Sequence, residues 1–194
     1  MDKFSYAIGL GIGQNLMSMG AKGLDVDDFA KAVADVLNGR PTAMTHTEAR
    51  DIVNKYFSEM EEKMKAQNIE NGKKFLEENA KRPEVTVLPS GLQYEVITQG
   101  AGKQPKASDR VKVHYEGTLI DGTLFDSSVK RGEPAVFGVT QVIKGWVEAL
   151  QLMNEGAKWR LFIPSDLAYG AQQAGELIPP YSTLVFEVEL IKVL

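Results

Sequence analysis

The sequence predicts an α+β protein in which a helical first part precedes a second part of antiparallel strands. Up to Met64, apolar residues recur at the three- and four-residue spacing of amphipathic helices. After Pro83, apolar and polar residues alternate as in strands that bury one face. A short helix-forming run near Trp146 interrupts these strands. One helix among antiparallel strands is typical of an α+β domain.

Two short helices are expected in the first forty residues. Residues 5–19 carry an apolar stripe, although three glycines at positions 9–13 lower the helix propensity. Their spacing is not G-x-G-x-x-G and no strand precedes them, which argues against a phosphate-binding loop. A second helix is bounded by Asp25, a good N-cap, and by Gly39, the favoured residue past a helix end. Both helices need a third element or a second chain to cover their apolar stripes.

A much longer third helix is expected next. Residues 45–48, Thr-His-Thr-Glu, form a capping box, and the helix continues until Pro83 stops it, a length of roughly 55 Å. Its first half, up to Met64, has a strong apolar stripe. Its second half is mostly charged, with Phe75 and Leu76 as an isolated apolar pair. We therefore expect packing at one end of this helix and a solvated stalk at the other.

The second part should contain several strands. Asp121-Gly122 is a dipeptide typical of a hairpin turn. The last strand should bury Leu184, Phe186 and the apolar residues that alternate after them. Extended segments are expected at 92–96, 111–116, 124–128, around Phe137, and at 159–164 and 183–194. The predicted domains are a helical domain at 1–44, a connecting helix at 45–83 and a sheet domain at 84–194.

Composition excludes several functional classes. The 194 residues carry a net charge of −4, which argues against a nucleic-acid or anionic-membrane partner. The chain has no cysteine, so disulfides, thiolate metal sites and thiol nucleophiles are all excluded. No segment approaches the ~20 consecutive apolar residues of a membrane span. The first residues do not resemble a signal peptide, so we expect a cytoplasmic protein, or a periplasmic one from which a signal has been removed.

Acid–base and metal chemistry find little support. The two histidines are His46, at a helix start, and His114, which we expect to point to solvent on the strand face opposite Tyr115. Neither has the partners of a catalytic triad or a metal site. Glu187 and Glu189 fit the solvent face of the last strand. No metal or cofactor is expected.

A set of aromatic and apolar residues with a few polar groups remains, and this is the composition of a ligand pocket. Tryptophan at a junction between a loop and a helix is usually packed or contacted on its large face. An ordinary core tryptophan is the alternative for Trp146 taken alone. The members of the set are Tyr115, Phe125, Asp126, Trp146, Tyr169 and Phe186.

Six short blocks, in order and at matching spacing, resemble the FK506-binding (FKBP) prolyl isomerases over about residues 89–194. The blocks are VHYEG at 113–117, FDSS at 125–128, VIKGW at 142–146, AYG at 168–170, IPP at 178–180 and TLVF at 183–186. The first part resembles the dimerisation region and stalk of the macrophage infectivity potentiator (Mip) and its bacterial relatives. The resemblance implies a twisted antiparallel sheet wrapped on one short helix, with a pocket between them.

The same resemblance implies the roles of individual residues. Trp146 would form the pocket floor, and Asp126 would lie near the twisting amide with Arg131 beside it. The Ile143 amide and the Tyr169 hydroxyl would hold substrate carbonyls, and Leu177 and Ile178 would flank the pocket. The remaining wall residues would be Tyr115, Phe125, Phe137, Val142 and Phe186. Ala135 and Ala174 stand where the best-known eukaryotic members carry an aromatic residue and a histidine, and the 134–146 segment is shorter, which bears on macrolide affinity.

We therefore expect a homodimeric peptidyl-prolyl isomerase that acts on proline-containing peptides and partly folded proteins, with possible ligands of the FK506 and rapamycin type. Rotation about an Xaa-Pro amide is slow because resonance must be broken, at about 18–20 kcal/mol. A dry aromatic pocket favours the less polar twisted amide, and a thousandfold acceleration needs only about 4 kcal/mol. One alternative is a client-holding chaperone with little turnover. Another is a monomer whose helical part binds a target helix.

Overall fold

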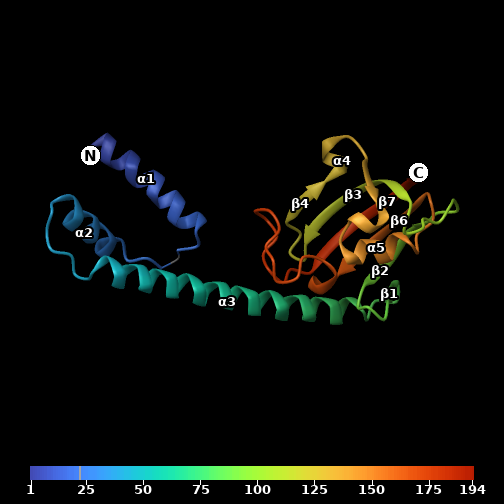
Figure 1. Ribbon diagram of the computed structural model, residues 1–194, viewed down its shortest axis with the longest axis horizontal. Coiled ribbons are helices and arrows are strands. Elements are labelled where there is room, and N and C mark those ends of the chain that lie inside the picture. Colours follow the sequence, from blue (N-terminus) through green and yellow to red (C-terminus); the bar gives the residue numbers. More distant parts are fainter. Residues whose placement is uncertain (22) are drawn as a thin grey trace. The chain divides into compact units, whose positions relative to one another are not determined.

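The computed structural model describes residues 1–21 and 23–194, which divide into two compact units, Met1–Phe57 and Ser58–Leu194. The first unit contains α1 (Lys3–Ser18), α2 (Val26–Leu37) and the beginning of α3 (His46–Asn79), which ends in the second unit (Figure 1). The three predicted helices are present, and α1 begins two residues earlier than expected. No helix in the described part of the chain is long and apolar enough to cross a bilayer.

Side-chain caps define where these helices begin. An Asp2 carboxylate oxygen accepts a hydrogen bond from the Ser5 amide at 2.7 Å, and Asp25 accepts from two amides in the first turn of α2. The predicted capping box is present: the Glu48 amide donates to the Thr45 hydroxyl, and the Thr45 amide donates to the Glu48 carboxylate. In the first unit, no side chain of α1 or α2 is buried.

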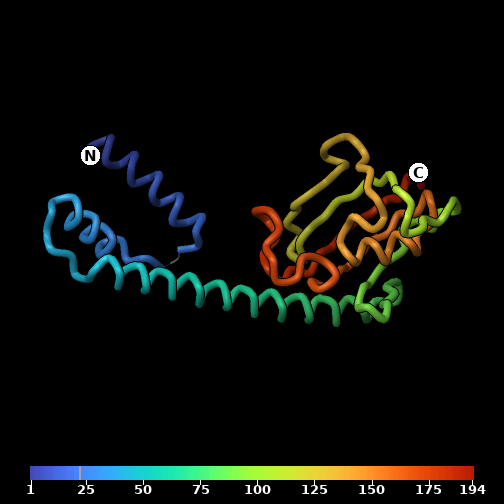
Figure 2. The backbone as a smooth tube through the Cα atoms, viewed as in Figure 1, coloured from blue at the N-terminus to red at the C-terminus, as the bar shows by residue number. Residues whose placement is uncertain are grey.

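The second unit is built on a seven-stranded sheet of order β1-β2-β6-β7-β3-β4, in which β5 also pairs with β3. Every strand pair is antiparallel. The strands are β1 (Val85–Val87), β2 (Gln93–Gln99), β3 (Arg110–Leu119), β4 (Leu124–Ser127), β5 (Ala135–Gly138), β6 (Ala157–Ile163) and β7 (Leu184–Val193). The short helices are α4 (Ser128–Arg131) and α5 (Lys144–Leu150), with 3-10 turns at Val139–Gln141 and Ser165–Leu167. Figure 2 follows the same path as a tube.

The core of this unit lies between one face of the sheet and α5. Alternate residues of the long strands point into it, as the sequence predicted, and α5 contributes Trp146, Ala149 and Leu150. The predicted hairpin turn joins β3 to β4, with Gly122 at φ +87° and a Leu119 amide bond to the Thr123 carbonyl. The buried strand residues include Val111, Val113, Tyr115, Trp159, Leu161, Leu184, Phe186, Val188 and Leu190.

The prediction of a solvated stalk is wrong for the last turns of α3. Phe75 and Leu76 are not an isolated pair, because the Phe75 ring lies 6.0 Å from the Phe162 ring on the outer face of β6. Gly72 and Asn79 are buried. The last turns of α3 therefore pack on the sheet face opposite α5. Their charged residues occupy the helix faces that point away from the sheet.

His114 also differs from its prediction. The ring is partly buried, and its Nδ1 atom lies 3.0 Å from the Ser128 hydroxyl oxygen. Ser128 is fully buried and also accepts a hydrogen bond from the Tyr115 amide. The outer-face prediction for the last strand is correct for the exposed Glu189, whereas Glu187 is half-buried between Arg160 and Lys158.

Candidate active site

A cavity of about 800 Å³ opens between the inner face of the sheet, α5 and the loop before β7. It gathers all the site residues expected from the sequence except Arg131, from segments more than sixty residues apart in the chain. The lining residues are Tyr115, Phe125, Asp126, Phe137, Gln141, Val142, Ile143, Trp146, Tyr169, Ala174, Gly175, Glu176, Leu177, Ile178 and Phe186.

The floor of the cavity is Trp146, in the first turn of α5. Its ring is 4% exposed and meets three rings edge to face: Phe186 at 5.3 Å, Tyr115 at 5.4 Å and Phe137 at 6.0 Å between centroids. Edge-to-face contacts are a favoured arrangement of aromatic rings. The indole N–H finds no acceptor among the described residues.

Two glycines permit this close packing. A Cβ atom at position 145 would lie 2.6 Å from Ile163, so glycine is needed where α5 crosses β6 beside Trp146. A Cβ atom at position 117 would lie 2.6 Å from both the Phe125 and the Phe186 rings, whose centroids are 5.5 Å apart. Both glycines belong to the sequence blocks that carry the family resemblance.

The polar side of the cavity is a three-residue cluster. The Tyr115 hydroxyl donates to an Asp126 carboxylate oxygen at 2.5 Å, and Arg131 forms a close ion pair with the other oxygen. Arg131 also donates to the Tyr115 hydroxyl at 2.9 Å. Arg131 is exposed and does not line the cavity, but its bonds hold Asp126 and Tyr115 in place.

Electrostatics keep this cluster in one protonation state. Burial acts to raise the pKa of Asp126, but the hydrogen bonds from Tyr115 and Arg131 outweigh it and hold the pKa below its ordinary value. Burial, with the hydrogen bond to Asp126, raises the pKa of Tyr115. The pKa of Arg131 is raised chiefly by its bonds to Tyr115 and Asp126. At neutral pH the cluster therefore consists of a carboxylate, a neutral phenol and a guanidinium.

The rim of the cavity carries the groups expected to meet a ligand's backbone. The Ile143 amide, just before α5, has no acceptor among the described residues. Tyr169 is 41% exposed and Leu177 is 50% exposed, and both lie in the loop between β6 and β7, on the other side of the cavity from Ile143. In that loop, reciprocal backbone bonds pair Ala174 with Ile178.

Sequence reasoning missed Gln141, Gly175 and Glu176, and it named Ala174 only as a departure from the family. Gln141 precedes the VIKGW block, and its side chain accepts from the Gly138 amide at 3.3 Å. The other three residues lie in the small hairpin that Ala174 and Ile178 close. Their closeness in sequence to Leu177 is the signal that could have identified them. No three His, Asp or Glu side chains gather as metal ligands within residues 1–21 and 23–194.

Comparison with known proteins agrees with this geometry. Residues 101–191 match the family described as FKBP-type peptidyl-prolyl cis-trans isomerase, and residues 1–96 match the domain amino-terminal to it. The chain is 50% identical to the FKBP-type 22 kDa peptidyl-prolyl cis-trans isomerase of Escherichia coli, over 98% of this chain and 94% of that protein. It is 44% identical to the outer membrane protein MIP of Legionella longbeachae, over 99% and 85%.

Among solved structures, FkpA from Escherichia coli superposes with a TM-score of 0.81 at 38% identity, covering 98% of this chain and 95% of that one. The antiparallel sheet and the amino-terminal helices are thus shared with FkpA. The chain belongs to the FKBP-type peptidyl-prolyl cis-trans isomerases, in the Mip-like group that carries an amino-terminal helical domain.

Proposed function

We propose that the cavity above Trp146 is where this isomerase binds and twists the Xaa-Pro amide. The observation that carries the proposal is the enclosure of the indole by three edge-on rings, with one ionised carboxylate at the edge of the cavity. The proline ring would lie on Trp146, and the amide would lie near Asp126. The Ile143 amide and the Tyr169 hydroxyl would bind the neighbouring carbonyls.

Such a cavity catalyses by differential binding. The planar amide carries more charge separation than the twisted one, so transfer from water into aromatic walls costs the ground state more. The Asp126 carboxylate would interact with the amide as its nitrogen becomes pyramidal. Each tenfold acceleration requires about 1.4 kcal/mol of preference for the twisted form.

Exchange spectroscopy by NMR on a short Xaa-Pro peptide tests the proposal. Wild-type protein should broaden the cis and trans signals, and Asp126→Ala should lower the exchange rate about ten- to a hundredfold while peptide binding persists. The exposed Asp166→Ala variant is the matched control. Unchanged exchange in Asp126→Ala would remove Asp126 from the mechanism. Binding without exchange in wild type would favour the client-holding chaperone.

We further propose that the helical unit pairs two chains. Phe4 is 75% exposed, Met17 80% and Leu37 79%, which is more apolar surface than a monomer usually leaves in water. Sedimentation equilibrium on the full chain should give twice the chain mass, and Ile8→Glu on α1 should lower it. A monomeric wild type at all concentrations would instead favour the target-helix alternative.

The same cavity also suggests which substrates and ligands the protein binds. The proposed substrates are proline-containing peptides and partly folded proteins, because the open rim admits an extended chain. Ala135 and Ala174 lack the aromatic and histidine side chains of the eukaryotic members, so we expect FK506-type macrolides to bind weakly; calorimetric titration measures this. The cytoplasmic location stays a prediction, which cell fractionation against periplasmic markers would test.

A further inference from the structure

The second half of α3 presents one stripe of residues to the rest of its unit. Positions 68, 72, 75, 76 and 79 are three or four residues apart, so they share one helix face. They are less exposed than the residues between them, which point to solvent. Two of the five are asparagines and one is glycine, which is why the stripe escapes a search for apolar periodicity.

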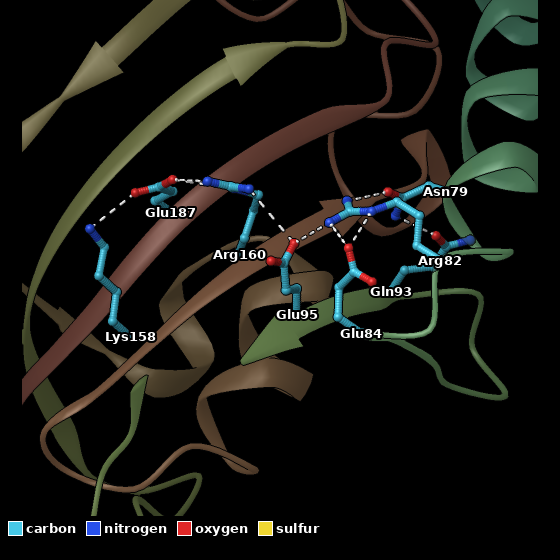
Figure 3. Close-up of polar contacts among 8 residues, drawn as sticks. All are labelled: Asn79, Arg82, Glu84, Gln93, Glu95, Lys158, Arg160 and Glu187. Carbon is cyan, nitrogen blue, oxygen red and sulfur yellow. Dashed lines mark hydrogen bonds and ion pairs between the residues drawn. The ribbon is translucent and has the colours of Figure 1, made fainter. Parts of the chain in front are cut away.

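The C-terminal end of this stripe is anchored to the outer face of the sheet (Figure 3). The buried Asn79 side chain donates to the side-chain oxygen of Gln93 at 2.8 Å, and the Gln93 side-chain amide donates to the Leu76 backbone carbonyl at 2.9 Å. Arg82 donates to Glu84 and to Glu95. Buried polar pairs of this kind have little freedom, because moving one partner leaves the other without a hydrogen bond.

The ion pairs continue across the neighbouring strands. Glu95 on β2 lies 3.7 Å from Arg160 on β6, and Arg160 pairs with Glu187 on β7 at 2.5 Å. Lys158 closes the row at 3.0 Å from Glu187. The end of α3 is thus bonded directly to β2, and Glu95 links that contact to an ion-pair network across β6 and β7.

The N-terminal end of the stripe, Asn68 and Gly72, meets the segment 179–183, which leads into β7. The Asn68 side chain donates to the Pro180 carbonyl at 2.9 Å. Gly72 lies so close to buried Thr183 that a Cβ atom there would be 2.4 Å from the threonine hydroxyl oxygen. In Figure 2 this loop, drawn in orange to red, runs beside α3.

This segment directly follows part of the cavity wall. Ile178, which lines the cavity and is 6% exposed, immediately precedes it. The Tyr181 amide donates to the Gly170 carbonyl at 2.7 Å, and Gly170 follows Tyr169 of the cavity rim. Tyr181 has φ +58°, a left-handed conformation that is uncommon for a residue other than glycine and needs surrounding contacts to persist.

We propose that Asn68 and Gly72 are positioning residues of the isomerase: they hold 179–183 against α3 and thereby fix Ile178 and Tyr169 opposite Trp146. The inference rests on the proposed site. Displacement of reacting groups by about 1 Å lowers rates by up to about a hundredfold. A loosened segment should therefore lower kcat more than it raises KM, because Trp146 and its rings stay in place.

Gly72→Ala in the full-length protein provides the first test. The new methyl group should push Thr183 away and lower kcat for an Xaa-Pro peptide about tenfold, with a shift of the Ile178 methyl signal in the NMR spectrum. Adding Thr183→Ala removes the clashing hydroxyl and should restore most of both readouts. Urea unfolding of Gly72→Ala, which should remain fully folded under the assay conditions, separates this effect from a loss caused only by weaker folding.

Asn68→Ala provides the second test, since it removes one hydrogen bond without adding bulk. Its matched control is Asn71→Ala, an exposed asparagine on the same helix. Asn68→Ala should lower kcat several-fold and move the Ile178 signal, whereas Asn71→Ala should change neither. Wild-type kcat in both Gly72→Ala and Asn68→Ala would overturn the positioning role. If Asp126→Ala were also fully active, the proposed site itself would be wrong.

Discussion

At the scale of single residues, the polar cluster decides which charge the cavity presents to a ligand. Tyr115, Asp126 and Arg131 satisfy one another's hydrogen bonds, so each restrains the others. The phenol ring of Tyr115 also forms part of the aromatic wall. The cluster therefore couples the position of the carboxylate to the packing around Trp146.

The protonation states predict a flat pH profile. Because the pKa of Asp126 is lowered and those of Tyr115 and Arg131 are raised, none of the three changes charge between about pH 5 and 9. Peptide isomerisation followed by NMR should give constant kcat/KM over that window. A bell-shaped profile centred near neutrality would contradict the assignment.

The sign of the stability effect follows from the same shift. A carboxyl group with a lowered folded-state pKa stabilises the fold above its unfolded pKa, and the effect is lost as pH falls through the folded value. The contribution of Asp126 should therefore be complete above about pH 5 and disappear in acid. Urea unfolding of wild type and Asp126→Asn at pH 7 and pH 3 compares the two directly; a larger difference at pH 3 would be the wrong sign.

Tyr115→Phe keeps the ring and removes the hydroxyl. The pKa of Asp126 should rise, because one of the two side-chain hydrogen bonds that lower it is lost. The rate of isomerisation should fall about three- to tenfold, because the net contribution of one typical hydrogen bond is about 1 kcal/mol. Carbon-13 titration of the Asp126 carboxyl measures the first effect. The control is Tyr94→Phe, whose ring stacks on Trp159.

At the scale of secondary-structure elements, α5 is held close to the sheet by a residue without a side chain. Gly145→Ala would place a methyl group 2.6 Å from Ile163, so we expect a loss of about 1–3 kcal/mol in urea unfolding, together with lower activity. The matched control is Gly9→Ala in α1, where a Cβ atom meets nothing within 4 Å. Alanine there should stabilise the helix by up to about 1 kcal/mol. Equal effects at the two positions would contradict this account.

The docked end of α3 depends on polar contacts as well as on Phe75. Asn79→Ala leaves the Gln93 side-chain oxygen buried without its donor, and we expect a cost of about 1–3 kcal/mol in the free energy of unfolding. Glu78→Ala, on the exposed face of the same turn, should change it by less than about 0.5 kcal/mol. Hydrogen exchange of the α3 amides would show whether the loss is local; unchanged protection in Asn79→Ala would argue against the anchor.

At the scale of the whole molecule, the proposed dimer places two cavities in one particle. A peptide with two Xaa-Pro sites joined by a flexible linker should bind the wild type at least about tenfold more tightly than a peptide with one site. The Ile8→Glu variant should lose this gain while it keeps the activity of each cavity. Equal affinities in the wild type would show that the two cavities do not act together on one chain.

Much of the architecture was predictable because it depends on local rules. Helix limits were signalled by Asp25, by the capping box at residue 45 and by Pro83, each of which acts through neighbouring backbone groups. Alternation revealed the buried faces of β3 and β7. The site residues were expected from motif resemblance, and the cavity gathers all of them except Arg131, although their catalytic roles stay a proposal.

The amino-acid sequence by itself determined the fold class, the order of elements and the residue types that make an aromatic pocket without a nucleophile. Only the tertiary structure decided that Asn68 and Gly72 meet the segment 179–183, that Asn79 meets Gln93 on β2, and that His114 contacts Ser128. The physical reason is that these residues are polar or are glycine, so a search for apolar periodicity does not identify them. Each of these residues contacts a partner more than ten residues away in the sequence. Contacts between residues so far apart in the sequence form only when the chain folds.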